Sequence, residues 1–325
     1  MSATSSSIAV GSGQPRHHVI IGSGVAGNQA AEILREREPD SRITIITASS
    51  LLFYNRYQLP NVFRGCHDWR AFLAYSPDYY RQKRIIVRRN SLVSCVDGVN
   101  RMIKFAHNES MRYDTLLVAS GGRGYMPEDL MEFKPLMHGF GSFEQAMTVY
   151  RQLPEGGRVV MLGGDTIGLD LARTLIYTGY RVTLVANEHT FFPHQVVAEE
   201  RPKFLSGLTA IGVDVVDGDK AGGVTALEKG ARGLPARRVL FRDGSDLYGD
   251  IVLPFMGLVP AVEFMVGSGP DIERGLLVSP SLRTTDPSIF AAGDVCQIWS
   301  AEESAAIDSI MDTATCARWG FGGAT

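Results

Sequence analysis

The feature that most restricts the possible folds is an internal repeat of a strand, a glycine-rich turn, a helix and a second strand. The first copy reads HHVIIGSGVAGNQAAEILREREPDSRITIITASS, and the second reads RVVMLGGDTIGLDLARTLIYTGYRVTLVANE. In each copy an apolar run of strand length leads directly into glycines, and apolar residues at helical spacing follow. A strand, a helix and a parallel strand form the βαβ unit, so the repeat predicts an α/β protein with two such domains.

The first turn has the complete spacing G-x-G-x-x-G, at Gly22, Gly24 and Gly27. In such a turn the first glycine permits the tight bend, the second lets the backbone approach a pyrophosphate, and the third lets helix and strand pack closely. The phosphates then lie on the N–H groups at the positive end of the helix. The sequence therefore predicts a bound nucleotide, held by Gly22, Ser23, Gly24, Ala26 and Gly27.

The second turn has Asp165 at the middle position of the spacing. A carboxylate about 5 Å from a phosphate charge costs roughly 3 kcal/mol at an effective dielectric constant of about 20. Two interpretations stay open: Asp165 caps the helix in a site that no longer binds a nucleotide, or the site still binds NAD(H), either tolerating the acid or with weakened affinity. The candidate residues of this second site are Gly163, Gly164, Asp165, Thr166, Ile167, Gly168, Asn187 and Gly257.

Composition excludes several classes of function. A net charge of −3 over 325 residues argues against nucleic acid as the main partner. Cys66, Cys95, Cys296 and Cys316 are too scattered for a redox pair or a metal site. The chain has no run that could span a bilayer, and residues 1–15 resemble a disordered tail, not a signal peptide. We therefore expect a soluble, cytoplasmic protein without a metal.

Four motifs together carry a resemblance to a known family. They are VIIGSGVAG (19–27), YDTLLVASGGR (113–123), VVMLGGDTIGLDLA (159–172) and TTDPSIFAAGDV (284–295). In content, order and spacing the chain resembles the FAD-dependent pyridine-nucleotide(-disulfide) oxidoreductases over nearly its whole length. Within that family it is most similar to the rubredoxin reductase and nitrite reductase flavoprotein branch.

The resemblance implies two Rossmann-like, three-layer dinucleotide-binding domains, as in the glutathione-reductase-like FAD/NAD(P) fold. The FAD-binding domain would be discontinuous, with residues 16–140 and 263–325. The NAD(P)-binding-like domain, residues 150–262, would be inserted in it. A helix after Asp294 would point its N-terminus at the flavin ring. The residues that the resemblance and the first turn assign to FAD are Gly22, Ser23, Gly24, Ala26, Gly27, Thr47, Ser49, Asn55, Arg56, Leu59, Val93, Ala119, Ser120, Gly121, Arg123, Gly293, Asp294 and Val295.

Several positions depart from the family pattern. Arg56 stands where disulfide-type relatives carry a reactive cysteine, so a disulfide substrate is not expected. Thr47 to Ser50 replace an acid at the adenosine ribose, and Asn61 replaces a flavin-side lysine whose usual glutamate partner is Asp170. The segment Val259-Pro260-Ala261 replaces the family's R-P-N. Relatives usually continue into a third, interface domain, so this chain is expected to be a short form or a fragment.

The leading functional hypothesis is electron transfer from NADH through FAD to a redox partner protein of the iron-sulfur, rubredoxin, ferredoxin or haem type. No side chain is a convincing acid or base catalyst. One alternative is an FAD subunit of a larger redox complex with a degenerate nicotinamide site, and another is a structural flavoprotein. Association as a hetero-complex subunit or a homo-oligomer is expected. The basic run RQKRIIVRR (81–89) is a candidate docking face, or an ordinary solvated surface.

Overall fold

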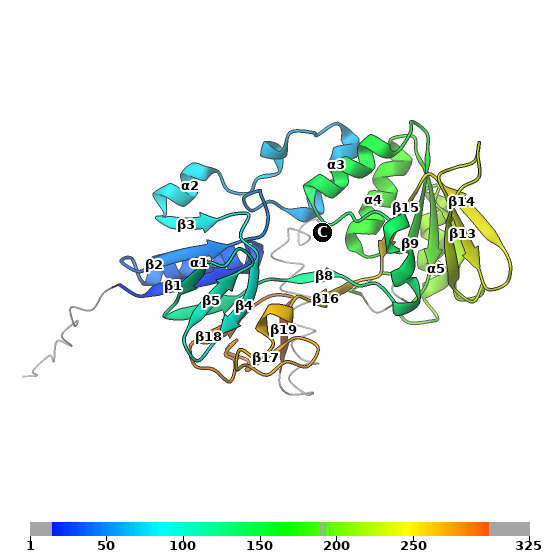
Figure 1. The fold of residues 1–325 in the computed structure, drawn as a ribbon. Coiled ribbons are helices and arrows are strands. Elements are labelled where there is room, and N and C mark those ends of the chain that lie inside the picture. The colour runs from blue at the N-terminus through cyan, green and yellow to red at the C-terminus, as the bar shows by residue number, and fades with distance from the viewer. Residues whose placement is uncertain (1–14, 189, 192, 195, 299–325) are drawn as a thin grey trace, which may run out of the picture. The chain divides into compact units, whose positions relative to one another are not determined.

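A computed structural model gives the structure of the protein and describes residues 15–298, except 189, 192 and 195. The chain divides into two compact units (Figure 1). The first unit runs up to Phe53 and also contains Tyr75–Gly121 and the chain from Pro260 onward. The second unit contains Tyr54–Ala74 and Gly122–Val259.

The main sheet of the first unit is parallel throughout, with the strand order β18-β7-β1-β2-β3. Its strands are β1 (His17–Ile21), β2 (Arg42–Ile46), β3 (Ile85–Arg88), β7 (Thr115–Val118) and β18 (Ile289–Ala291). Runs such as HVII are buried on both faces, as the central strands of a parallel sheet must be. Ile21 pairs with Ile46 and with Val118, so these three strands end at one edge of the sheet.

Helix α1 (Val25–Arg37) follows β1, and α2 (Pro77–Gln82) precedes β3. A smaller antiparallel sheet contains β4 (Val93–Asp97), β5 (Met102–Phe105) and β6 (Ser110–Arg112). Strands β17 (Leu276–Val278) and β19 (Cys296–Ile298) pair in parallel, and a short 3-10 helix, η4, spans Glu263–Met265. Buried apolar residues of β4, β5, β17 and η4 form one core with residues of β1, β2, β7 and β18.

The second unit repeats the parallel arrangement with the strand order β11-β10-β9-β15. These strands are β9 (Arg158–Gly163), β10 (Arg181–Ala186), β11 (Asp214–Asp217) and β15 (Ile251–Phe255). An antiparallel sheet contains β12 (Val224–Lys229), β13 (Arg237–Phe241) and β14 (Asp246–Gly249). The helices are α3 (Phe143–Gln152), α4 (Thr166–Tyr177) and α5 (Arg201–Ala210).

Three 3-10 helices also lie in the second unit: η1 (Arg56–Arg64), η2 (Trp69–Phe72) and η3 (Glu128–Leu136). Strand β8 (Gly122–Gly124) pairs with β16 (Leu258–Pro260), at two of the four points where the chain passes between the units. Among the described residues, no helix is both long enough and apolar enough to cross a bilayer.

The compact units differ from the predicted domain boundaries in two segments that were expected in the FAD-binding domain, and in residues 260–262, which were expected in the NAD(P)-binding-like domain and belong to the first unit. Segment Tyr54–Ala74 belongs to the second unit because η1 packs on α3 and α4. Arg64 Nη2 donates a 2.8 Å hydrogen bond to Thr174 Oγ1 of α4, which helps to fix that packing. The chain from Gly122 also belongs there, and Leu130 of η3 lies in the core beneath β12 and β13.

Candidate dinucleotide-binding sites

Two of the three glycines in the first turn are required by the chain itself. Gly22 has a φ of +112°, and a Cβ placed on it would lie 2.0 Å from the carbonyl oxygen of Ala119. A Cβ on Gly27 would lie 2.1 Å from the carbonyl oxygen of Gly22. These glycines therefore let β1, β7 and α1 approach one another closely, as the G-x-G-x-x-G spacing predicted.

Neither a positive φ nor a steric contact with the described residues requires a glycine at the middle position, Gly24. Its φ of −77° is open to any residue, and a Cβ there would have no described atom within 4 Å. Gly24 is the N-cap of α1 and offers no side chain to the N–H groups of the first turn. The open space and the uncapped N–H groups fit the pyrophosphate of a dinucleotide, which is an anion held at a helix N-terminus.

Asn28 fixes the first turn from inside, and sequence reasoning missed it. Its side chain is buried, and Nδ2 donates to the carbonyl oxygens of Ser23 at 2.8 Å and Gly24 at 2.9 Å. The hydroxyl of Tyr80 donates to Asn28 Oδ1 at 2.7 Å, and burial raises the pKa of that phenol, so it remains a donor. The one signal in the sequence is an asparagine on the apolar face of a helix, which leaves its partner undefined.

The other first-unit motifs end at the same edge of the sheet. The N–H of Ala119 donates to the Ile21 carbonyl at 2.7 Å, and Ser120 Oγ donates to the Ala261 carbonyl at 2.8 Å. A Cβ on Gly293 would lie 3.3 Å from Cβ of Ala26, so the AAGD turn directly adjoins the first glycine turn. Asp294 is exposed there, whereas Val295 is fully buried in the core.

The hydroxyls that replace the family's acid lie just beyond β2. Thr47 Oγ1 accepts from the N–H of Ser49 at 3.2 Å, and Ser49 Oγ accepts from the N–H of Leu51 at 3.0 Å. A hydroxyl that accepts one hydrogen bond still has a proton to donate. The turn therefore orders both hydroxyls without using up their capacity to bind a ribose.

Five of the residues predicted to bind FAD belong to parts of the fold other than the first glycine turn and the strand ends beside it. Asn55, Arg56, Leu59 and Arg123 belong to the second unit, and Val93 lies in the core of the first. Asn55 caps η1 through a 3.0 Å bond from the N–H of Tyr57, and Leu59 is fully buried. Arg56 is exposed. A role for these residues toward FAD stays a prediction.

The second glycine turn has the same frame as the first. Gly163 has a φ of +78°, and a Cβ on it would lie 2.3 Å from the carbonyl oxygen of Phe255 in β15. A Cβ on Gly168 would lie 2.6 Å from the Phe255 ring. The outer glycines are again required for close packing of strand and helix.

The middle position of the second turn differs from the first. Asp165 is the N-cap of α4, and its Oδ1 accepts a 2.8 Å hydrogen bond from the N–H of Gly168. Burial raises the pKa of the Asp165 carboxyl above its usual value, and hydrogen bonds from the N–H groups of Gly168 and Ile167 oppose that rise. An acid can occupy this turn because its carboxylate accepts the hydrogen bonds that a phosphate would accept.

The remaining candidates for the second site lie around this turn. The N–H of Asn187 donates to Thr190 Oγ1 at 2.9 Å, directly after β10, and Glu188 beside it is exposed. Gly257 has a φ of +88°, and its carbonyl accepts from the N–H of Tyr125 at 2.9 Å. Asn61, in the position of the family's lysine, accepts a 2.8 Å bond from Arg64 Nη1.

The remaining predictions concern the cysteines, a metal site and the helix after the AAGDV motif. Cys66, Cys95 and Cys296 are unpaired thiols, and Cys316 lies outside the described residues. Burial, with the charge of Asp294, raises the pKa of the Cys296 thiol to about 12. The described residues include no group of three side chains suited to a metal ion. Directly after Val295 the chain forms β19, and the helix expected beyond the AAGDV motif falls outside the described residues.

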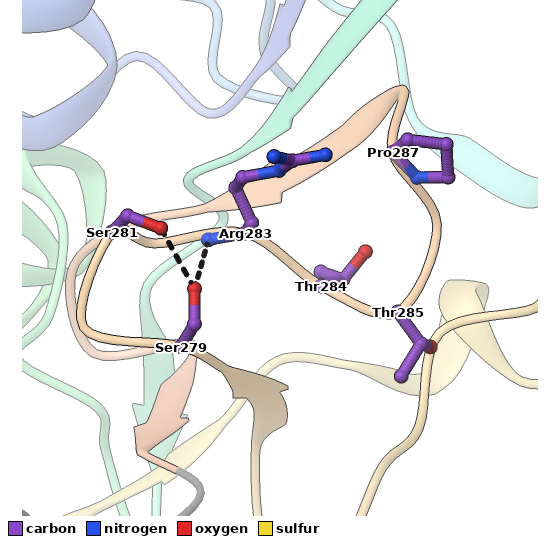
Figure 2. Close-up of a pocket in the computed structure, with 6 residues that line it drawn as sticks. All are labelled: Ser279, Ser281, Arg283, Thr284, Thr285 and Pro287. Carbon is purple, nitrogen blue, oxygen red and sulfur yellow. Dashed lines mark hydrogen bonds between the residues drawn. The ribbon is translucent and has the colours of Figure 1, made fainter.

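A polar hollow precedes the AAGDV motif, and Figure 2 shows its lining side chains. It is lined by Ser279, Ser281, Arg283, Thr284, Thr285 and Pro287. Ser279 Oγ hydrogen bonds Ser281 Oγ at 2.9 Å and accepts from the N–H of Arg283 at 3.3 Å (Figure 2). Thr284 Oγ1 donates to the carbonyl of Ile289 at 2.8 Å. These hydroxyls hold their own turns, and none of the predicted site residues lines the hollow.

Comparison with known proteins decides the family. The model of the pyridine nucleotide-disulphide oxidoreductase family matches residues 16–319. The chain belongs to the pyridine nucleotide-disulphide oxidoreductase family. A nitric oxide reductase FlRd-NAD(+) reductase of Klebsiella pneumoniae is 30% identical over 281 residues, which are 86% of this chain and 72% of that protein. A rubredoxin-NAD(+) reductase of Pseudomonas putida is 26% identical over 278 residues, with 85% and 71% covered.

A solved relative shows the same fold. The crystal structure of the covalent putidaredoxin reductase–putidaredoxin complex matches with a TM-score of 0.78 and 24% identity, over 89% of this chain and 70% of that one. The predicted family and the α/β fold with two Rossmann-like domains are therefore confirmed. As a member of this family, the protein is an FAD-dependent oxidoreductase, and the relatives named above are NAD(+) reductases.

Proposed function

We propose that the protein takes electrons from NADH into FAD and passes them to a small redox partner protein of the rubredoxin or iron-sulfur type. The observation that carries the proposal is the open space at Gly24, which a dinucleotide pyrophosphate fits and no described atom of the chain fills. The relatives support the partner class, since their names join NAD(+) reductase activity to FlRd and to rubredoxin.

The chain's own residues have a positioning role in this proposal. Gly22, Gly24 and Gly27 would let the FAD pyrophosphate reach the N-terminus of α1, and Asn28 holds the turn that presents it. Thr47 and Ser49 would bind the adenosine ribose. The turns at Ala119 and Gly293 would flank the cofactor at the same sheet edge. When bound, FAD supplies the redox chemistry, because it accepts a hydride from a nicotinamide and releases electrons singly.

The second glycine turn would receive NADH. Glu188 is exposed directly after β10, where a dinucleotide's adenosine ribose lies in such units. A carboxylate there repels the extra phosphate of NADPH, so we propose a preference for NADH. We also propose a cytoplasmic location, since the three described cysteines are unpaired and scattered.

A second candidate function keeps FAD and omits the nicotinamide step. The Asp165 cap favours it, because the carboxylate already takes the N–H groups that a pyrophosphate needs. In that case the chain would be the FAD subunit of a larger redox complex, supplied with electrons by another protein.

The basic run 81–89 is poorly suited as a docking face for the redox partner. Arg81 pairs with Asp78, Arg88 pairs with Glu109, and Arg84 and Arg89 donate to backbone carbonyls. The four arginine side chains are therefore held by local contacts, which does not favour them as docking groups.

The deciding experiment is anaerobic reduction of the purified flavoprotein. Excess NADH or NADPH is mixed in a stopped-flow instrument, and bleaching of the visible flavin band is followed. Fast bleaching by NADH, with slower bleaching by NADPH and electron transfer to oxidised rubredoxin, is the expected result. If dithionite bleaches the flavin and neither nucleotide does, the second candidate function replaces the first.

A further inference from the structure

The N-cap positions of the two glycine turns have nearly the same backbone conformation, and the residue there is Gly24 in the first turn and Asp165 in the second. Gly24 has φ −77° and ψ −169°, and Asp165 has φ −76° and ψ 177°. Both residues are the N-cap of the helix that follows the first strand of a βαβ unit. At the N-cap the backbone therefore leads into α4 as it leads into α1, and Asp165 adds a carboxylate that Gly24 lacks.

The Asp165 carboxylate occupies the place of a ligand on α4. Its Oδ1 lies 2.8 Å from the N of Gly168, and the N–H of Ile167 also bonds it. Pyrophosphate oxygens bind the same first-turn N–H groups in dinucleotide sites of this type. A nucleotide and the Asp165 side chain therefore compete for one set of donors.

The other contact at this turn does not compete. The N–H of Phe191 donates to the carbonyl oxygen of Gly164 at 2.6 Å. A phosphate is an acceptor and makes no use of a carbonyl oxygen. The competition is thus confined to the amides and to Asp165.

We propose that Asp165 is an internal counter-anion that must leave the α4 amides before NADH can bind, and that it sets the nucleotide affinity of this site. The inference rests on the proposed function, in which NADH binds at the second glycine turn. Binding is weakened twice, because the helix loses its cap and because the displaced carboxylate stays near the phosphates. Together these effects correspond to about tenfold to hundredfold in the dissociation constant.

The test measures NAD+ binding to the FAD-loaded protein by isothermal titration calorimetry, because NAD+ does not reduce the flavin. Asp165→Gly removes both the charge and the cap, and Asp165→Asn keeps a capping oxygen without the charge. Ser142→Gly is the matched control, since Ser142 caps α3 in the same unit through a 3.2 Å bond from the N–H of Gln145.

We expect opposite changes in affinity and stability. Asp165→Gly binds NAD+ about tenfold to hundredfold more tightly and melts at a lower temperature, since α4 has lost its cap. Asp165→Asn gains a smaller factor in affinity with little loss of stability. Ser142→Gly melts lower with unchanged affinity.

The outcomes separate this inference from the proposed function. If the wild-type protein binds NAD+ and both Asp165 variants bind it equally or less well, the inference is wrong and the proposed function stands. If only Asp165→Gly binds the nucleotide, the inference is supported and the NADH step of the proposed function is wrong for the natural protein. If no variant binds and NADH leaves the flavin oxidised, both are wrong.

Discussion

Replacing Gly24 with alanine tests whether the empty space in the first turn belongs to FAD. The substitution adds one methyl group at a position where the chain itself has no described atom within 4 Å and where φ is −77°. The apoprotein should tolerate it. Alanine gains about 0.4–1 kcal/mol from a less flexible unfolded chain and loses on the order of 1 kcal/mol as a poorer N-cap.

The cofactor should not tolerate the substitution. If the FAD pyrophosphate fills this space, the added methyl group overpacks it, at a cost of about 1–3 kcal/mol. That cost corresponds to an increase in the FAD dissociation constant of roughly 5-fold to 150-fold. The expected pattern is therefore a normally folded apoprotein that retains little flavin during purification.

Two measurements and one control check this reasoning. Urea unfolding of apoprotein gives the change in stability, and titration of apoprotein with FAD, followed by flavin fluorescence, gives the dissociation constant. Gly27→Ala is the control, because its Cβ would lie 2.1 Å from the Gly22 carbonyl oxygen and should cost above about 3 kcal/mol of stability. Wild-type FAD affinity in a well-folded Gly24→Ala protein would refute the assignment of this space to the cofactor.

Three further predictions concern the first unit. Arg35→Met should lower the free energy of unfolding by about 3–5 kcal/mol in urea titrations, because the buried guanidinium donates to five backbone carbonyls that would lose their partner. Asn28→Ala should weaken FAD binding measured by fluorescence titration and lower stability by about 2–3 kcal/mol, since it releases the first turn and strands the Tyr80 hydroxyl. Burial, together with the charge of Arg42, lowers the pKa of His17. The unfolded state therefore binds the proton first, and stability should fall as the pH drops below about 6.5. His17→Gln should flatten that fall in melting temperatures measured from pH 8 to pH 5.

The repeat in the sequence was sufficient to predict both parallel sheets and the roles of their outer glycines. Spacing alone revealed Gly22, Gly27, Gly163 and Gly168, because close packing leaves no alternative residue at those positions. It also revealed that Asp165 was unusual. Spacing could not decide where its side chain points, since a carboxylate that caps a helix and one that faces a ligand have the same sequence.

Long-range contacts account for most of what the sequence left out. Asn28 and Tyr80 are 52 residues apart, and nothing local marks them as a pair. Segment Tyr54–Ala74 was expected in the FAD-binding domain because LLFYNRYQLPNVFRG (51–65) resembles a family segment beside the flavin. Its apolar residues instead pack on α3 and α4, and such a choice depends on the shape of the surface available.

Helix α4 has a side-chain cap and α1 has none among the described residues, so the stability of the two units should depend differently on the supply of FAD. Helix α4 is complete as soon as its unit folds, because Asp165 provides the acceptor for its first turn. Helix α1 has no such side-chain acceptor among the described residues and would gain one when FAD binds. A ligand at a hundred times its dissociation constant adds about 2.7 kcal/mol to folding stability. In flavin-starved cells the first unit should therefore be the one that opens first.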